Sequence, residues 1–198
     1  MAVPKEPKTA VQKEPKTAPE KGSKPRKSFL RTSNKNIFKT KIVQMRRVSK
    51  TLKGGKKLTF SAVVIVGDET GRVGVGIGRA NDANVSVEKA TYNGKKNLVQ
   101  IPLTKNDSVP HLVYGNFGAS DVLIKPAGIG TGVVAGGPVR AVLELAGVKN
   151  VSAKQLGSNN IINNARATIV ALKALRDIKT ICAERSISFK IFRNRIIH

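Results

Sequence analysis

The alternation of glycine with β-branched residues at 73–78 restricts the fold of this chain more than any other feature. The segment reads VGVGIG, and a period of two is typical of a β-strand. Because one face of this strand carries no side chains, another element can approach its backbone closely. The following residues, about 82–98, predict a helix for that face, with Asp82 as its N-cap. The helix positions at core spacing are Val87, Ala90, Gly94 and Leu98.

Two apolar segments flank Gly54-Gly55 and predict an antiparallel hairpin before the glycine-containing strand. Paired glycines accommodate the positive φ angles of a tight turn. The residues after the turn that alternate onto one face are Leu58, Phe60, Ala62, Val64 and Val66. Residues 68–71, Asp-Glu-Thr-Gly, give a second turn. Residues 37–103 are therefore expected to form a first domain of three strands and one helix.

Residues 104–180 predict a second domain that also mixes strands and helices. Residues 109–125 indicate two strands. A short helix is expected over 138–146, since this segment begins with proline and is followed by glycine. A last helix is expected from about 160 to 178. The core positions of the two helices are Val139, Val142, Leu143, Ala146, Ile162, Ala165, Ile169 and Leu172. The fold class is therefore α+β, with two small α/β domains.

The two ends of the chain lack a core-forming pattern. Residues 1–36 contain the hexamer KEPKTA twice, at 5–10 and 13–18, and their prolines prevent a continuous helix. With so little apolar surface, this basic tail is expected to be disordered, and it lacks the apolar region of a signal peptide. A solvated tail without specific function and an extension that contacts RNA both remain open. Residues 181–198 form a second basic tail without a fold assignment.

The charge of the chain indicates a polyanionic partner. The formal net charge is +24, from 36 Lys+Arg against 12 Asp+Glu, and the sequence pI is about 10.7. Residues 21–67 contain fourteen Lys or Arg and no acidic residue. Nucleic acid fits this pattern, whereas a membrane does not, because no apolar run approaches the ~18–20 residues of a spanning helix. The lone Cys182 excludes an intramolecular disulfide and suits a reducing compartment.

The predicted hairpin concentrates positive charge around its glycine turn. Lysine and arginine bind phosphates as point charges or forks, and glycine lets the backbone approach RNA. A run of charge is often only a solvated face, but the absence of nearby acid favours RNA contact here. Lys95 and Lys96, at the end of the expected helix, would extend the surface. The candidate contacts in the hairpin are Arg46, Arg47, Lys50, Lys53, Lys56 and Lys57.

The glycine clusters do not match nucleotide-binding motifs. In the cluster at 74–78, Arg79 stands where the dinucleotide fingerprint requires its last glycine. The cluster at 128–132 lacks the Lys-Ser/Thr of a phosphate-binding loop. Close packing, or close contact with RNA or protein, is the simpler role for both. No nucleophile–base pair and no group of metal ligands stands out, so no catalytic residue, metal, cofactor or small-molecule substrate is predicted.

Two long segments carry a family resemblance. The first, residues 46–80, reads RRVSKTLKGGKKLTFSAVVIVGDETGRVGVGIGRA and closely resembles the first domain of the bacterial-type small-subunit ribosomal protein S-five family. The second, residues 126–168, reads PAGIGTGVVAGGPVRAVLELAGVKNVSAKQLGSNNIINNARAT and resembles the second domain, within a likeness that spans about 38–176. The resemblance implies a first domain like a double-stranded-RNA-binding fold without its first helix. It implies a second domain with a four-stranded sheet and two helices.

The resemblance also implies partners and site residues. The main ligand would be small-subunit rRNA, with ribosomal proteins four and eight as neighbours and mRNA near its entry path. The family influences decoding accuracy. In the hairpin, the match adds four RNA-contacting candidates, Val48, Ser49, Gly54 and Gly55. In the second domain, the matched positions are Lys154, Gly157, Ser158, Asn163 and Arg166, of which Lys154 and Arg166 are taken as RNA contacts.

Arg140 falls where the family places its boundary with protein four, and Glu144 lies four residues later on the same expected helix. Both are candidate interface residues, although the two could simply pair with each other. The sequence departs from the family at Lys56, where arginine is frequent and would form a planar fork. It also departs at Gly94, where alanine is usual, and in PAGIGTG, which replaces the commoner PASEGTG.

The main hypothesis is therefore a structural, non-enzymatic, rRNA-binding protein of the small ribosomal subunit. A free double-stranded-RNA-binding regulator is the alternative, although the second motif would then need another explanation. The expected location is the ribosome of a bacterial cytoplasm, with a plastid or another organelle as the alternative.

Overall fold

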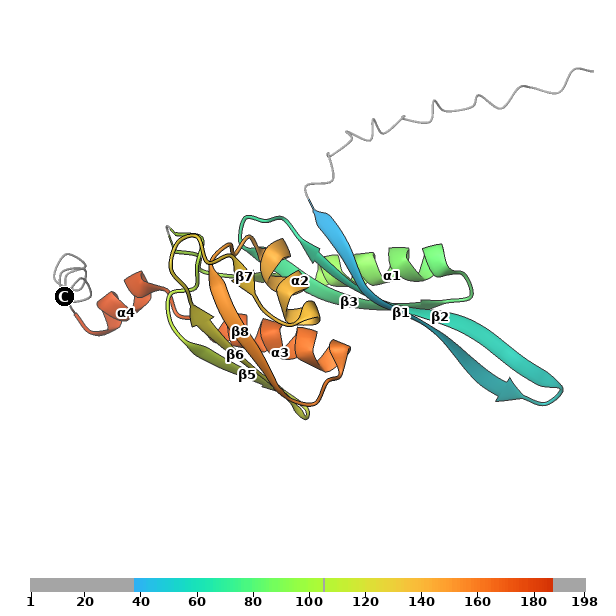
Figure 1. Cartoon of the computed structure of the whole chain (residues 1–198). Helices are drawn as coiled ribbons and strands as arrows, with labels where there is room; N and C mark the ends of the chain where they lie inside the picture. The colour runs from blue at the N-terminus through green and yellow to red at the C-terminus, as the bar shows by residue number, and fades with distance from the viewer. Residues whose placement is uncertain (1–37, 105, 187–198) are drawn as a thin grey trace, which may run out of the picture. The chain divides into compact units, whose positions relative to one another are not determined.

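The computed structural model of the chain describes residues 38–104 and 106–186. The tail expected over 1–36 lies outside the described residues, as does most of the tail expected over 181–198. The described part contains two four-stranded sheets and four helices (Figure 1). This arrangement confirms the predicted α+β class.

The first sheet has the strand order β1-β2-β3-β4, and all its neighbours are antiparallel. The strands of this sheet and the helix in the same part of the chain are, in chain order, β1 (Lys39–Leu52), β2 (Gly55–Gly67), β3 (Arg72–Ala80), α1 (Ala83–Lys96) and β4 (Val99–Gln100). The predicted hairpin is present, but its turn consists of Lys53 and Gly54, because Gly55 already pairs with Leu52. Of the two glycines at the turn, only Gly54 has a positive φ, 87°. The two-residue strand β4 is additional to the three predicted strands and is too short to leave a periodic pattern.

Helix α1 packs against the glycine face of β3, as predicted. A side chain at Gly78, Gly76 or Gly74 would overlap the α1 backbone near Ser86, Ala90 and Gly94 respectively. Asp82 is the N-cap residue, as predicted, although its side chain makes no capping hydrogen bond. One detail of the expected helix was wrong. Leu98 lies beyond the end of the helix, because the chain turns at Asn97 to form β4.

Strand β2 is buried on both faces over its second half. The small core on the α1 side consists of Ala62, Val64, Val66 and Ala90. Ile65 faces the other way and joins the main core with Leu143 and Leu172. The predicted apolar stripe does not stay buried towards the hairpin, since Leu58 is 49% exposed. No described element covers that part of the strand, so its alternation produces no core.

The second sheet has the order β5-β6-β8-β7, in which β7 is parallel to β8 and the other pairs are antiparallel. The strands of this sheet and the helices in the same part of the chain are, in chain order, β5 (Val113–Phe117), β6 (Ser120–Pro126), β7 (Val133–Val134), α2 (Gly137–Ala146), β8 (Val151–Gly157), α3 (Ile161–Ala174) and α4 (Ile178–Glu184). The four predicted core residues of α2 are all buried. Gly147 ends this helix with φ 86°, as expected for a glycine C-cap.

The last predicted helix, expected from about 160 to 178, is α3, which ends four residues earlier than expected. Asn160 caps α3, since its side chain accepts a hydrogen bond from the Ile162 amide at 3.1 Å. The helix ends at Ala174 because Leu175 adopts an extended conformation with ψ 130° and is itself buried. The separate helix α4 crosses the boundary expected at 180/181. Ala165 and Leu172 are fully buried as predicted, whereas Ile162 and Ile169 are only half-buried.

The turn between β2 and β3 joins the first sheet to helix α2 through backbone hydrogen bonds. The amides of Glu69 and Gly71 donate to the carbonyls of Leu145 and Ala146, each at 3.1 Å. The turn therefore satisfies acceptors that the end of a helix otherwise leaves open. Side chains at Gly67 or Gly147 would overlap this contact. The base of the hairpin and the end of α2 thus form one packed unit.

Candidate nucleic-acid interface

The outer part of the β1–β2 hairpin is a two-stranded ribbon without a third strand. The last pair between β2 and β3 is Phe60 with Ala80, whereas β1 and β2 remain paired out to Leu52 and Gly55. Figure 1 shows this ribbon extending away from both sheets, and every residue of 45–58 is exposed. A two-stranded hairpin alone is only marginally stable in water. The outer ribbon is therefore open to contact with a partner along its whole length.

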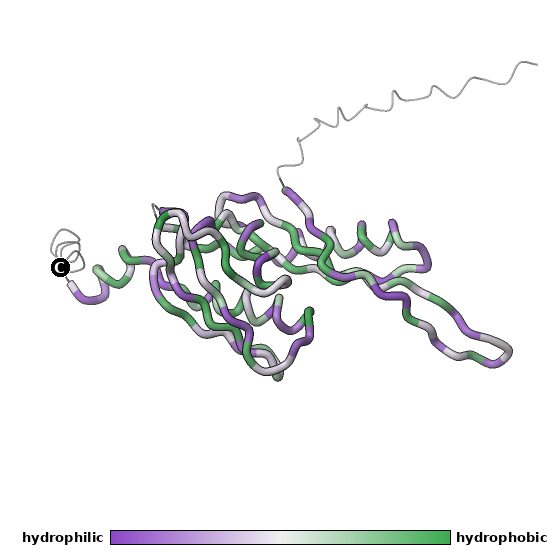
Figure 2. Tube along the Cα trace, viewed as in Figure 1, coloured by the Kyte–Doolittle hydropathy of each residue, from purple (hydrophilic) through white to green (hydrophobic). Residues whose placement is uncertain are grey.

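The register places like charges opposite each other on the ribbon. Lys50 pairs directly with Lys57, an arrangement that destabilises an antiparallel pair. Figure 2 shows hydrophilic residues recurring along both strands towards the turn. None of the six predicted hairpin cations forms an ion pair with a residue that the structure describes. A bound polyanion would relieve this repulsion.

The cations divide between the two faces of the ribbon, because paired residues in an antiparallel ladder share a face. Arg46, Lys50 and Lys57 lie on one face, Arg47 and Lys56 lie on the other, and Lys53 occupies the turn. The predicted hairpin residues Val48, Ser49, Gly54 and Gly55 belong to the same ribbon. The structure thus brings all ten candidates in the hairpin together.

One cation of this surface was missed by the sequence analysis. Arg79 of β3 pairs with Ser61, which in turn pairs with Arg46, so the three residues form one row across the sheet. Arg79 is exposed and borders a hollow of about 430 Å³ beside the ribbon. The residues that line this hollow are Val48, Ser49, Lys50, Lys57, Thr59 and Arg79. Only the strand register reveals this proximity, because Arg79 is distant from the hairpin turn in sequence.

Lys95 and Lys96 do not extend the hairpin surface. They follow Gly94, which packs against Val66 at the end of β2 that is remote from the turn. The Lys95 Nζ lies 5.8 Å from the centre of the Phe38 ring, and the Lys96 Nζ lies 4.4 Å from that of Tyr92. Both positive charges also suit the negative end of the α1 dipole. They form a separate basic patch.

The candidates in the second domain lie on its own sheet and helix. Lys154 is exposed on β8, paired with Leu123 of β6. Arg166 of α3 lies over the Phe117 ring at 5.2 Å from its centre. The matched residue Ser158 contacts the turn between β5 and β6, since its amide donates to the Ala119 carbonyl at 2.8 Å. This region is separate in structure from the hairpin ribbon.

Arg140 and Glu144 form the ion pair that the sequence allowed, and a third residue joins them. The Arg140 Nε lies 2.7 Å from one oxygen of Glu144, and the Lys41 Nζ lies 2.8 Å from the other. Hydrogen bonds from Lys41 and then from Arg140 lower the pKa of Glu144 below its ordinary value. Glu144 therefore links α2 to β1, near the base of the hairpin.

Comparison with known proteins identifies the family. The chain matches the model of "Ribosomal protein S5, N-terminal domain" over residues 38–102 and that of "Ribosomal protein S5, C-terminal domain" over 115–185. The chain belongs to the ribosomal protein S5 family. It is 54% identical over 170 residues to the small ribosomal subunit protein uS5 of Prochlorococcus marinus (strain AS9601), covering 83% of this chain and 82% of that protein. It is 52% identical over 166 residues to the protein of that name from Synechocystis, covering 84% and 96% respectively.

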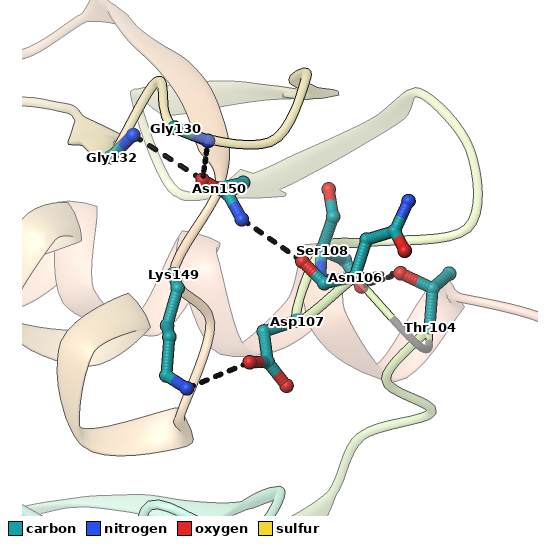
Figure 3. A network of polar contacts seen from close by, with 8 residues as sticks. All are labelled: Thr104, Asn106, Asp107, Ser108, Gly130, Gly132, Lys149 and Asn150. Atoms are coloured by element: carbon teal, nitrogen blue, oxygen red, sulfur yellow. Dashed lines mark hydrogen bonds and ion pairs between the residues drawn. The ribbon is translucent and has the colours of Figure 1, made fainter.

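In this S5-family chain, Asn150 holds the glycine loop before β7 (Figure 3). Its side-chain oxygen accepts hydrogen bonds from the amides of Gly130 and Gly132, at 3.1 and 3.4 Å. Its side-chain nitrogen donates to the Asn106 carbonyl at 3.0 Å. Sequence reasoning missed Asn150, because its partners are distant in sequence. The loop amides are thus used within the chain. Close packing does not account for these glycines, because nothing lies within 4 Å of a side chain added at Gly128, Gly130 or Gly132. Gly130 and Gly132 instead have positive φ angles, 90° and 75°, which glycine adopts without strain.

Within 38–104 and 106–186, no helix is long and apolar enough to cross a membrane. Over the same residues, the His, Cys, Asp and Glu side chains form no group of three or more that could hold a metal ion.

Proposed function

We propose that this S5-family chain is a structural, non-enzymatic constituent of the small ribosomal subunit that holds rRNA with its β1–β2 ribbon. The relatives carry the name of a small-subunit protein. The observation that supports the ribbon as the contact is the direct pairing of Lys50 with Lys57 on an exposed hairpin. Such repulsion costs stability in the free protein, and RNA phosphates would neutralise it.

The proposed RNA contacts lie on both faces of the ribbon and at its turn. The Lys and Arg side chains would bind phosphates, whereas Gly54 and Gly55, at the turn, would let the backbone approach RNA closely. Lys95 with Lys96, and Lys154 with Arg166, would form further contacts away from the ribbon. These separate patches fit a protein that touches several rRNA segments.

The proposed neighbours are small-subunit proteins four and eight, and mRNA near its entry path. The exposed group of Arg140, Glu144 and Lys41 is the proposed boundary with protein four. Its salt links are exposed, so a neighbouring acidic group could exchange for Glu144 as the partner of Arg140. A boundary of this kind would influence decoding accuracy. The proposed setting is the ribosome of a bacterial cytoplasm, and a plastid or other organelle remains the alternative.

The test is the salt dependence of binding to small-subunit rRNA. The slope of log affinity against log salt should be about −0.9 for each neutralised phosphate on duplex RNA and about −0.7 on single strands. Replacing Lys50, Lys56 and Lys57 together by Gln should make the slope less steep by about two to three. The matched control replaces three exposed lysines elsewhere, Lys89, Lys125 and Lys173, by Gln. Equal effects of both triple variants would refute the ribbon as the main contact.

Sedimentation separates the ribosomal function from the alternative of a free double-stranded-RNA-binding regulator. A structural protein should co-migrate with the small subunit after a high-salt wash. Recovery of the washed protein only in the soluble fraction would contradict the proposal.

A further inference from the structure

The hollow beside Arg79 has a different character from the rest of the ribbon. It has a volume of about 430 Å³, which is within the range of sites for small organic groups and much too small for a duplex. Three of its lining residues are cations: Arg79 lies in an inner row of the sheet, and Lys50 and Lys57 lie in an outer row. Arg46 shares the inner row with Arg79 but does not line the hollow. The two rows are four residues apart along β1, or about 13 Å.

Between the two cationic rows, the surface carries no charge. This middle row consists of Val48 paired with Thr59. Val48 is 37% exposed and presents an apolar surface. The Thr59 hydroxyl lies 3.5 Å from the Val48 carbonyl, a long contact that leaves the oxygen able to accept a hydrogen bond. A phosphate gains little at such a position, whereas a base or sugar can contact the methyl groups and bond to the hydroxyl.

We propose that this hollow binds one unpaired nucleotide of RNA, with its base against Val48 and Thr59 and its flanking phosphates held by the two cationic rows. The proposal rests on the proposed function and names the RNA feature that the ribbon selects. Unpaired nucleotides can be displaced from a helix, so that their edges become available for hydrogen bonds and their faces for packing. Arg79 is well suited to the inner phosphate, because its planar fork can bind two oxygens. It thereby becomes a specificity-determining residue.

The experiment compares two RNA probes with the full chain. One is a plain duplex of about 16 base pairs, and the other is the same duplex with a single bulged 2-aminopurine nucleotide. The bulged probe should bind about tenfold tighter, at the lower end of what contact with one base contributes. Its 2-aminopurine fluorescence should change on binding, which reports on the nucleotide itself in the unmodified protein.

A filling variant isolates the hollow from the charge around it. Thr59→Tyr places bulk in the hollow without changing any charge, and tyrosine is well tolerated in strands. It should abolish the preference for the bulged probe and leave duplex affinity unchanged. The matched control is Thr51→Tyr, which adds the same bulk on the opposite face of the ribbon and should retain the preference. Arg79→Gln should reduce the preference and make the salt slope less steep by about one.

The outcomes separate this inference from the proposed function. Equal, salt-dependent binding of both probes by the unmodified protein overturns the hollow as a nucleotide site but keeps the ribbon as an RNA contact. Retention of the preference in Thr59→Tyr also overturns it, provided that the melting curve of the variant shows a folded protein. If the unmodified protein binds neither of the two probes and also does not bind small-subunit rRNA, the proposed function itself is refuted.

Discussion

Replacing Lys57 by Glu should stabilise the free ribbon and weaken RNA binding, two effects of opposite sign. Lys57 lies directly opposite Lys50, and both are exposed. Two unit charges about 6 Å apart in water repel by roughly 0.7 kcal/mol. Reversing one charge converts this repulsion into an attraction of the same size. Screening at physiological salt then leaves a net gain of about 0.7 kcal/mol.

Amide hydrogen exchange is the suitable assay, because the ribbon can open without unfolding the rest of the protein. A gain of about 0.7 kcal/mol corresponds to roughly threefold slower exchange of the ladder amides between Leu52 and Leu58. In the same variant, the salt slope of rRNA binding should be less steep by about one, since one phosphate contact is lost. The two measurements together test whether the lysine that destabilises the free ribbon is also one that binds RNA.

The control variant is Lys89→Glu, which changes the net charge equally on an exposed position of α1. It should leave exchange in the ribbon unchanged. Faster exchange of the ribbon amides in Lys57→Glu would refute the repulsion between Lys50 and Lys57 in the free protein. Unchanged RNA binding would refute the role of Lys57 as a phosphate contact.

Four further predictions follow from the packing and the ion pairs. Gly76→Ala should cost about 3 kcal/mol and lower the melting temperature by roughly 6–12 °C, because its side chain would overlap the α1 backbone; Gly55→Ala, in open space, should melt close to the unmodified protein. The pKa of Glu144 is lowered in the folded state, so the carboxylate stabilises the fold at pH values above its ordinary pKa of 4.5, and this stabilisation is lost as pH falls through the folded pKa. The stability difference between the unmodified protein and Glu144→Gln should therefore shrink on acidification below pH 4.5. A difference that stays constant with pH would contradict the role of the ion pairs. Arg140→Leu should leave small subunits assembled and raise stop-codon readthrough in cells that carry only this variant; normal readthrough would reduce Arg140 to its pairing within the chain. Deletion of 1–36 should leave the melting temperature nearly unchanged, and a large decrease would show that the domain boundary at 36/37 is misplaced.

Local sequence patterns determined most secondary structure and one of the main packing contacts. The period of two in β3, with glycine on one face, predicts both a strand and the close approach of a helix. The pairing of proline and glycine around α2 fixes that helix at both ends. These patterns succeed because the backbone period and the capping residues act over a few neighbouring positions. The high positive charge likewise indicated a polyanionic partner before any geometry was known.

The tertiary structure decided which parts of those patterns are buried and which residues meet. The alternation of β2 continues from Leu58 to Val66, but only the second half is covered, because α1 and the second sheet reach no further. Lys41 and Glu144, or Arg79 and Ser61, come together through strand register and sheet packing. Such contacts join positions far apart in the chain and leave no periodic signal in the sequence. The sequence therefore determined the elements and the charge, whereas long-range packing determined the faces on which that charge can act.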